Sequence, residues 1–531
     1  MKKNNFFGKI FVLLVLCIIL AGCDDKNGGM GNGNELAHFP FPQRSASLAT
    51  YQNRPMLPSN MMAAERDMID LFVSILNQNL IFDSRMPLNP QEFRIVFQHH
   101  TNSIRTQALE DHITVSESMG YGMLLLVYMA GSEERLTEAG HTWRFGAASL
   151  KDYYDGMLRT VLAFQSPLIV GGSTTRQHSW ELFGFNTGVN ETGLSVNNTS
   201  IHRTRGYRFY ENNISSAKIA PFANTIAGGV DGGGGSTGYN NNGTSSAADG
   251  DMDIIYSLIA ADKQWGSSGR FDYRQIALDM LEGFWRSVVN PHYNTIMFGD
   301  WSFAGARPDN ARTRPSDFML GHLRAFKAFD TARNWQLVID ATLNVIANIR
   351  DSQHVIENPN NGLLPDFTIR DNDTGKWIVP TVRVLESADN DGQYGWNSVR
   401  TPWRLGTAYL HYGDMAMTGS LSNPSLFTYS IKPLDDFAKA RVGNDRNTMR
   451  GLSMIYPINS PLANSTLGAT PSFVVPFVVT AAAVRNDQNW VDAFWTWSNT
   501  FHFENNWYAD YYKLIALITA SGNFWKPEAM N

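Results

Sequence analysis

The stretch AADGDMDIIYSLIAADKQW, residues 247–265, places three aspartates directly before a long apolar run. A loop rich in Gly and Asn, residues 227–250, leads the chain to this point. The run is apolar on nearly every face, which is typical of a helix that is surrounded by other helices. Carboxylates at the entrance of such a helix lose hydration, so they must be hydrogen-bonded, paired with cations or used in chemistry.

Helical periodicity recurs along the chain from residue 61 onwards, whereas the alternating pattern of strands is scarce. We therefore predict an all-α body with long connecting loops, some of which hold short hairpins. The segments 117–131 and 251–264 are apolar nearly all round, which places them in the inner of two helical layers. The expected helices, about twelve, are 62–78, 117–131, 150–164, 251–264, 272–289, 315–328, 332–349, 402–416, 433–442, 470–485, 489–499 and 508–520.

The composition fits a large globular domain with an ample core. The chain has 531 residues, of which 43% are hydrophobic and 17% charged, and we expect one domain over 61–531. The net charge of −6, without a long basic run, gives no electrostatic footprint for nucleic acid. We expect a monomer with no nucleic-acid partner.

The N-terminus has the pattern of an export signal. Three lysines precede the short apolar run 10–20, which ends in Leu20-Ala21-Gly22-Cys23 and resembles a bacterial lipobox. The sequence predicts a signal peptide over 1–22, a lipid on Cys23 and a flexible tether over 23–60 that is rich in Gly, Asn, Pro and Ser. An exported lipoprotein of the bacterial cell envelope follows, at the outer membrane or cell surface rather than the inner membrane. An ordinary signal peptide followed by a coincidental cysteine is the alternative.

A second acidic feature lies in SESMGYGM, residues 116–123. Ser116 is a candidate N-cap, which would place Glu117 in the first turn, near the positive end of the helix dipole. Complementing that dipole is enough to explain a glutamate. The glycines and methionines around Glu117 would also desolvate it, however, and desolvation raises a carboxyl pKa as a general acid requires.

Two separate acidic clusters on an aromatic-rich helical body suggest paired-carboxylate hydrolysis of a glycosidic bond. Residues 116–123 and 247–265 resemble the two signature regions of glycoside hydrolase family 8. FGDW at 298–301, RPSDF at 314–318 and NSVRTPWR at 397–404 agree with this resemblance. The resemblance implies an (α/α)6 barrel and an inverting mechanism on β-1,4-linked glycans. The two reacting carboxyl groups should then lie roughly 6.5–9.5 Å apart.

The resemblance also implies roles for individual residues. Glu117 matches the general acid, and Asp249 matches the residue that holds the sugar at the cleavage point. The usual base is an Asp one residue before Ser-x-Arg, where this chain has Asn397, and an amide cannot take a proton from water. The branch of the family with Asn here includes chitosanases, lichenases and some cellulases, and it takes its base from a Glu shortly upstream.

Glu386 is the nearest candidate for that base. Asp389 and Asp391 are rivals in the same loop. Tyr121, one turn after Glu117, could orient the acid, and Arg400 could contact the sugar or the loop that carries the base. Candidates for sugar-stacking platforms are Trp180, Trp265, Trp301 and Trp403, although a core position is an equal alternative for each.

Other site chemistries do not fit. The aspartates of 249–253 lack the Gly and Glu positions of an EF-hand, and His99-His100 lacks the spacing of a zinc helix. We expect no metal and no cofactor. The favoured hypothesis is an endo-acting β-glycanase, with glucan, chitosan and xylan left open as the polysaccharide substrate. A non-catalytic glycan-binding lipoprotein is the alternative.

Overall fold

The computed structural model describes residues 37–82, 95–97, 112–143, 149–163, 169–170, 177–178, 186–188, 246–300, 302, 311–352, 361–386, 391–452, 455–458, 469–500, 503–504 and 506–530. The chain divides into two units, Met1–Glu35 and Leu36–Asn531, and all described residues belong to the second. The predicted signal peptide, Cys23, Trp180, Trp301 and Asp389 lie outside the described residues.

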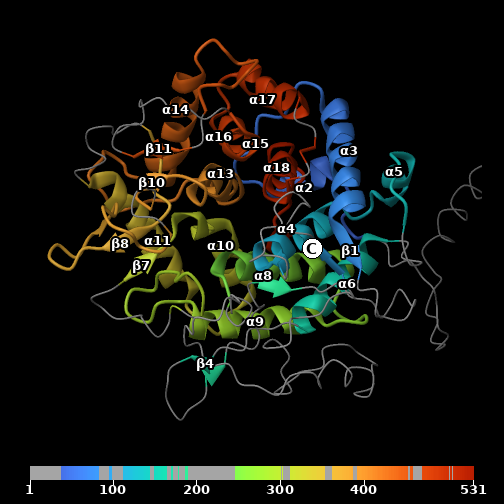
Figure 1. The fold of residues 1–531 in the computed structure, drawn as a ribbon, viewed down its shortest axis with the longest axis horizontal. Coiled ribbons are helices and arrows are strands. Elements are labelled where there is room, and N and C mark those ends of the chain that lie inside the picture. Colours follow the sequence, from blue (N-terminus) through green and yellow to red (C-terminus); the bar gives the residue numbers. More distant parts are fainter. Residues whose placement is uncertain are drawn as a thin grey trace, which may run out of the picture. The chain divides into compact units, whose positions relative to one another are not determined.

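Six helices of the described chain form a closed inner ring, because each packs against the next and the last packs against the first (Figure 1). In ring order they are α4 (Ser116–Tyr128), α8 (Ala248–Trp265), α10 (Leu320–Phe329), α13 (Thr401–Tyr412), α16 (Phe477–Val484) and α18 (Trp507–Ala520).

Six further helices alternate with the inner ones along the chain and pack on their outer side. They are α3 (Met61–Asn79), α6 (Leu150–Ala163), α9 (Tyr273–Ser287), α11 (Trp335–Asp351), α14 (Lys432–Val442) and α17 (Gln488–Thr500). This alternation of outer and inner helices is the (α/α)6 barrel, and the predicted helical fold class is confirmed. Each of the twelve predicted helices overlaps one of these twelve, but the predicted helix 470–485 is divided into α15 (Pro471–Val474) and α16, and the predicted helix 315–328 begins with the separate 3-10 turn η4 (Pro315–Asp317) before α10.

The two layers differ in their sequence pattern for a physical reason. An inner helix has neighbours on every side, and in α8 nearly every residue is buried. An outer helix buries one face only, so α9 alternates buried residues such as Phe284 with solvent-facing Arg and Gln. Two outer helices begin at polar caps: at α3, Asn60 accepts a hydrogen bond from the Ala63 amide (3.1 Å), and at α9, Asp272 accepts one from the Gln275 amide (2.9 Å).

Shorter elements occupy the connections between these helices. The short helices are α2 (Arg44–Thr50), α5 (Glu133–Glu138), α15 (Pro471–Val474), the 3-10 turns η4 (Pro315–Asp317), η5 (Ser398–Arg400) and η7 (Pro527–Ala529), and the π-helical turn η6 (Phe427–Ile431). The antiparallel pairs are β1 (Leu80–Phe82) with β2 (Ile95–Phe97), β3 (His112–Val115) with β6 (Asn186–Gly188), β4 (Ile169–Val170) with β5 (Gln177–His178), and β10 (Gln393–Tyr394) with β11 (Tyr456–Pro457). A three-stranded sheet has the order β7 (Arg312–Thr313), β8 (Thr368–Arg370) and β9 (Trp377–Ile378).

The predicted tether over 23–60 is wrong for its second half. Residues 37–60 pack against the barrel and include helix α2. The side chain of Phe41 is 3% exposed, and the Tyr51 hydroxyl donates to the Phe524 carbonyl at 2.9 Å. The polar, proline-containing composition concealed these two aromatic anchors, each of which buries a large apolar area.

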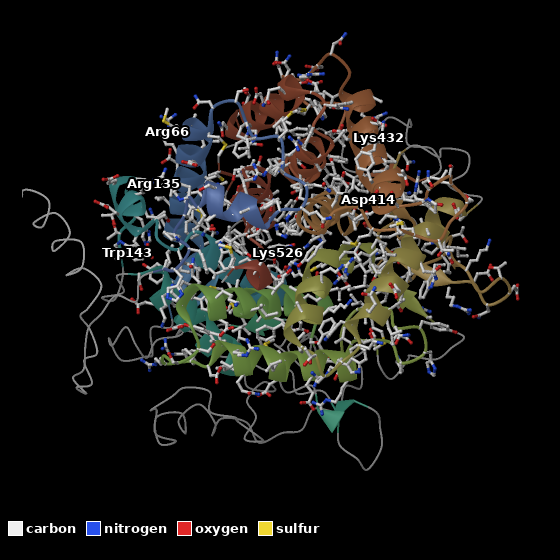
Figure 2. The ribbon with its side chains drawn as sticks, turned by 180° about the vertical axis from the view of Figure 1, so that it is seen from behind. Arg66, Arg135, Trp143, Asp414, Lys432 and Lys526 are labelled. Carbon is white, nitrogen blue, oxygen red and sulfur yellow. The ribbon has the colours of Figure 1, made fainter. Side chains whose placement is uncertain are left out.

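Some charged side chains of the outer helices point to solvent, although others, such as Asp435 on α14 at 1% exposed, are buried. Arg66 on α3 and Lys432 on α14 are exposed and labelled in Figure 2. In the described part of the chain, none of the helices combines the length and apolarity needed to cross a bilayer.

Helices α4 and α8 cross unusually closely, and two glycines permit this. A Cβ on Gly250 would lie 2.3 Å from Ser116 Oγ, and one on Gly120 would lie 2.7 Å from Asp253 Cβ. Since real Cβ atoms do not approach other atoms so closely, larger residues would force the two helices apart. The crossing places the first turns of both helices, and their acidic residues, side by side.

Gly250→Ala tests this constraint. We expect the free energy of unfolding to fall by about 1–3 kcal/mol, because the added methyl group overpacks a rigid crossing. Gly321→Ala in the inner helix α10 is the matched control, since its Cβ would meet nothing closer than 3.8 Å. The control should be neutral or slightly stabilising, as alanine favours a helix. Urea unfolding of the two variants measures this, and equal stabilities would contradict the argument.

Candidate active site

Glu117 lies in the first turn of α4, as the sequence predicts, and its side chain is 12% exposed. The Tyr121 hydroxyl, one turn later, donates to Glu117 Oε1 at 2.7 Å. Arg400 Nη1 pairs with the same oxygen. The expected cap is wrong: the helix already includes Ser116, whose buried Oγ has no hydrogen-bond partner within the described residues.

Asp249 lies in the first turn of α8, beside Glu117 across the helix crossing. Its Oδ1 accepts a hydrogen bond from the Gly250 amide at 3.0 Å. Its Oδ2 contacts two guanidinium groups, Arg400 Nη1 at 2.9 Å and Arg314 Nη2 at 3.0 Å. Asp249 is therefore a buried carboxylate with its charge compensated from two sides.

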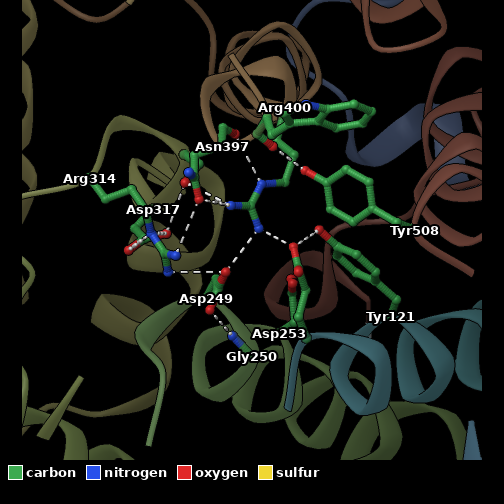
Figure 3. Close-up of polar contacts among 12 residues, drawn as sticks. Tyr121, Asp249, Gly250, Asp253, Arg314, Asp317, Asn397, Arg400 and Tyr508 are labelled. Atoms are coloured by element: carbon green, nitrogen blue, oxygen red, sulfur yellow. Dashed lines mark hydrogen bonds and ion pairs between the residues drawn. The ribbon is translucent and has the colours of Figure 1, made fainter. Parts of the chain in front are cut away.

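Arg400 connects the parts of this site (Figure 3). It lies in η5, just before α13, and is 2% exposed. Its Nη1 contacts Glu117 and Asp249, and its Nη2 donates to Ser316 Oγ at 3.0 Å. Its Nε donates to the Asn397 carbonyl at 3.1 Å. One planar group thus links α4, α8 and the loop that enters α13.

The pKa values of the two carboxyl groups on Arg400 are shifted in opposite directions. Burial raises the pKa of Glu117 and outweighs the opposing charge of Arg400, while the negative charge of Asp249 adds to the rise. Burial also disfavours the charged form of Asp249, but the guanidinium groups of Arg314 and Arg400 hold its pKa well below its usual range. An acid with a raised pKa beside a carboxylate with a lowered pKa is the arrangement that general acid catalysis requires.

Glu386 lies at an exposed position on a separate loop and is held by Asn397. The Asn397 side-chain amide donates to Glu386 Oε1 at 3.2 Å and to Oε2 at 3.3 Å. Asn397 Oδ1 in turn accepts from Arg400 Nη2 at 3.3 Å. A carboxylate at position 397 would repel Glu386, whereas the amide attracts it. The structure therefore brings Glu386, Asn397, Arg400 and Glu117 into one continuous network.

Asp391 occupies a different environment from Glu386. It is 1% exposed, and its Oδ2 accepts from the backbone amides of Val384 (2.6 Å), Leu385 (2.8 Å) and Glu386 (3.2 Å). Three donors already occupy this buried oxygen, so the carboxyl group holds the loop and is not presented to solvent as Glu386 is. Of the two rival candidates for the base, Asp391 is a buried residue that binds the backbone of the loop, and Asp389 lies outside the described residues.

The prediction that Trp265 and Trp403 form sugar platforms is wrong. Trp265 is 7% exposed and packs against Tyr154 at 5.2 Å between ring centroids. Trp403 is 1% exposed, and the Arg404 guanidinium covers its ring at 3.8 Å. Both are core residues of inner helices, where a sugar cannot reach their faces.

Two groups at the site were missed by sequence reasoning. Arg314 faces Asp249 from the residue before η4, and the motif at 314–318 already contained it. Trp396 is 44% exposed, and among the tryptophans whose side chains the structure describes it alone is exposed. Its carbonyl accepts from the Tyr508 hydroxyl at 2.5 Å, and the Tyr508 ring lies 6.0 Å from the Arg400 guanidinium carbon. Its position next to Asn397 was the signal that could have found it.

Asp253, the third aspartate of the stretch 247–265, is buried in a network of side chains that connects inner helices. Asp253 accepts hydrogen bonds from Arg404 Nη1 (2.8 Å) and Nη2 (2.5 Å), and its Oδ1 lies 2.8 Å from His322 Nε2. These three buried side chains connect α8, α10 and α13 below the site. The hydrogen bonds from Arg404 and the contact with His322 offset part of the cost of burying the Asp253 carboxylate.

Comparisons with known proteins agree with this geometry. Residues 233–424 match the family model described as Glycosyl hydrolases family 8. A β-glucanase of Niallia circulans is 38% identical over 287 residues, which are 53% of this chain and 63% of that protein. An endoglucanase of Bacillus sp. (strain KSM-330) is 32% identical over 285 residues, or 53% of this chain and 55% of that protein. The chain thus covers less than two thirds of the length of both relatives.

A solved structure is similar over a greater length. The apo structure of a β-1,3-1,4-glucanase from Paenibacillus sp. X4 has a TM-score of 0.66 and 27% sequence identity. The match covers 92% of this chain and 99% of that chain. The likeness therefore extends beyond the segment that the family model matches.

Proposed function

We propose that the chain is a member of glycoside hydrolase family 8 and an endo-acting enzyme that hydrolyses β-1,4-glycosidic bonds with inversion, and the family match over residues 233–424 and the similar glucanases support this. The observation that carries this proposal is that Glu117 and Asp249 share one guanidinium while their pKa values shift in opposite directions, with Glu386 held separately on its own loop. A protein that only binds glycans has no need of this arrangement.

The proposed reaction uses three carboxyl groups. Glu117 gives its proton to the glycosidic oxygen as the bond from that oxygen to the anomeric carbon breaks. Glu386 takes a proton from a water molecule, whose oxygen bonds to the opposite face of the same carbon. Asp249, kept ionised by Arg314 and Arg400, stabilises the positive charge that develops on the sugar ring. The reaction consumes one water molecule for each glycosidic bond that is cleaved.

A β-glucan is the substrate class that the comparisons favour. Both curated relatives and the similar solved structure are named as glucanases or endoglucanases. We propose that the exposed Trp396 stacks on a sugar ring next to the cleavage point, because indole faces pack well on the apolar faces of β-linked sugars.

Release of reducing ends from mixed-linkage glucan, carboxymethylcellulose, chitosan and xylan tests the proposal, with Glu386→Gln and Trp396→Ala alongside the unaltered chain. We expect cleavage of a glucan, loss of turnover but retained oligosaccharide binding in Glu386→Gln, and a KM raised about tenfold with kcat held in Trp396→Ala. Leu421→Ala is the control, since Leu421 is also exposed but lies in another loop.

Other results would favour a different function, a different base or a different substrate. Binding of a glucan without cleavage would favour the non-catalytic capture protein. Turnover that survives in Glu386→Gln would move the base to another carboxylate, with Asp389 the first to examine. Cleavage of chitosan or xylan alone would leave the mechanism standing and overturn the substrate class.

The pH dependence of activity tests the role of Glu117. Its hydrogen bond from Tyr121 favours the ionised form and so lowers its pKa. Tyr121→Phe removes that bond, the pKa rises further, and the acid keeps its proton to higher pH. We expect the alkaline limb of kcat/KM to move up by about one pH unit. Tyr128→Phe, also on α4 but bonded to the Trp525 carbonyl, should leave the limb in place. A downward shift in Tyr121→Phe would contradict the assignment.

We also infer that Cys23 carries a lipid that anchors the chain to the bacterial cell envelope. The support is the sequence Leu20-Ala21-Gly22-Cys23 behind an apolar run. Cys23→Ser should release the protein from the membrane fraction of the cell. Equal membrane retention of both forms would contradict the inference.

A further inference from the structure

One buried carboxylate accepts hydrogen bonds from the backbone amides of the loop that carries Glu386, and the Arg312 side chain donates to the Val384 carbonyl of the same loop at 2.9 Å. Asp391 Oδ2 accepts hydrogen bonds from three consecutive amides, those of residues 384, 385 and 386. Successive amides that converge on one anion form a nest, and hydrogen bonds to an ionised acceptor are short and strong. Neither a helix nor a strand includes residues 381–386, so this contact replaces the regular backbone bonds that fix Glu117 and Asp249.

The partner of Glu386 is fixed in the same way by a second buried carboxylate. Asp366 Oδ1 accepts from the Asn397 amide at 3.1 Å, from the Gly395 amide at 3.1 Å, and from the amide and hydroxyl of Ser398, both at 2.7 Å. Asp366 is 4% exposed. The backbone of Asn397, whose side chain binds Glu386, is therefore held by Asp366.

The two anchors also lie on backbone segments that bond to each other. The Phe367 amide donates to the Asp391 carbonyl at 2.9 Å, and the Asp366 amide donates to the Gln393 carbonyl at 2.7 Å. The two anchors are therefore connected by main-chain hydrogen bonds. The Phe367 side chain packs with Val384 and Phe298 in a small apolar cluster beneath the loop.

We propose that Asp391 and Asp366 are positioning residues that hold the Glu386 carboxylate against the Asn397 amide, at the place from which it activates water. This rests on the proposed function of Glu386. Neither aspartate exchanges a proton with the substrate. Their effect is on the placement of the base, and a misplacement of about 1 Å costs on the order of a hundredfold in rate.

Asp391→Ala is the decisive variant. We expect kcat to fall about a hundredfold with KM within about twofold, because the base is displaced while the sugar-binding groups remain. Asp391→Asn keeps an acceptor oxygen for the amides and should recover a large part of kcat. Circular dichroism and thermal unfolding show whether each variant is folded, and Asp366→Asn provides a second route to the same measurement.

A double substitution separates placement of the base from general damage. In a Glu386→Gln background there is no base left to misplace, so Asp391→Ala should lower the residual kcat no further. Asp371→Ala is the matched control: Asp371 accepts from the Asp373 amide (2.7 Å) and the Thr374 amide (3.3 Å) in the exposed turn between β8 and β9. It should leave kcat and KM unchanged.

These measurements separate the positioning role from the assignment of the base. Unchanged kcat in Asp391→Ala, or losses that add in the double variant, would overturn the positioning role while Glu386 remains the base. Equal loss in Asp391→Ala and Asp391→Asn would also overturn it, since the acceptor oxygen would then be irrelevant. Full turnover in Glu386→Gln would overturn the assignment of the base and this inference together.

Discussion

The site depends on the burial of one guanidinium group between two carboxyl groups. Without Arg400, Glu117 would face Asp249 across the helix crossing with no ion-pair partner of its own, and the cost of burying it would fall on the fold. Because Arg314 also pairs with Asp249 and not with Glu117, the compensation is unequal. That inequality separates the two pKa values: the better paired carboxylate stays ionised, and the other is dominated by burial. Electrostatic asymmetry here follows directly from geometry.

The helical layers were predictable from the sequence because the spacing of apolar residues along each helix reflects which of its faces are buried. A helix inside a ring of helices is apolar all round, and one on the rim is apolar along one face, so the sequence distinguishes α8 from α9. The segment 37–60 was not predictable in the same way. Its contacts are made by isolated aromatic residues such as Phe41 and Tyr51 with partners far along the chain, and isolated residues leave no periodicity. Composition alone therefore suggested a tether.

Within the site, predictability followed secondary structure as well. Glu117 and Asp249 stand at helix starts, which a sequence marks clearly, and the structure places them in first turns. Tryptophans gave no such mark: Trp403 and Trp396 are close in sequence, yet one is 1% and the other 44% exposed. Whether an indole faces the core or solvent depends on the residues that other helices bring to it. Those contacts are long-range, so no local pattern could assign the platform.

The loop of Glu386 has neither helical periodicity nor a local pattern that reveals which of its side chains are exposed, and its chemistry depends on long-range contacts. The acid and Asp249 take their precision from helices, whereas Glu386 stands on irregular backbone that has no hydrogen-bond ladder. Buried carboxylates replace the ladder: Asp391 gathers the amides of this loop, and Asp366 gathers those around Asn397. An amide at position 397 suits this arrangement, because a third negative charge between Glu386 and Asp366 would be repelled by both. The carboxyl groups of this region are alike in chemistry but differ in burial. Glu386 is exposed and able to react, whereas Asp391 and Asp366 are buried and hold it in place. Burial, which the sequence does not reveal, makes that division.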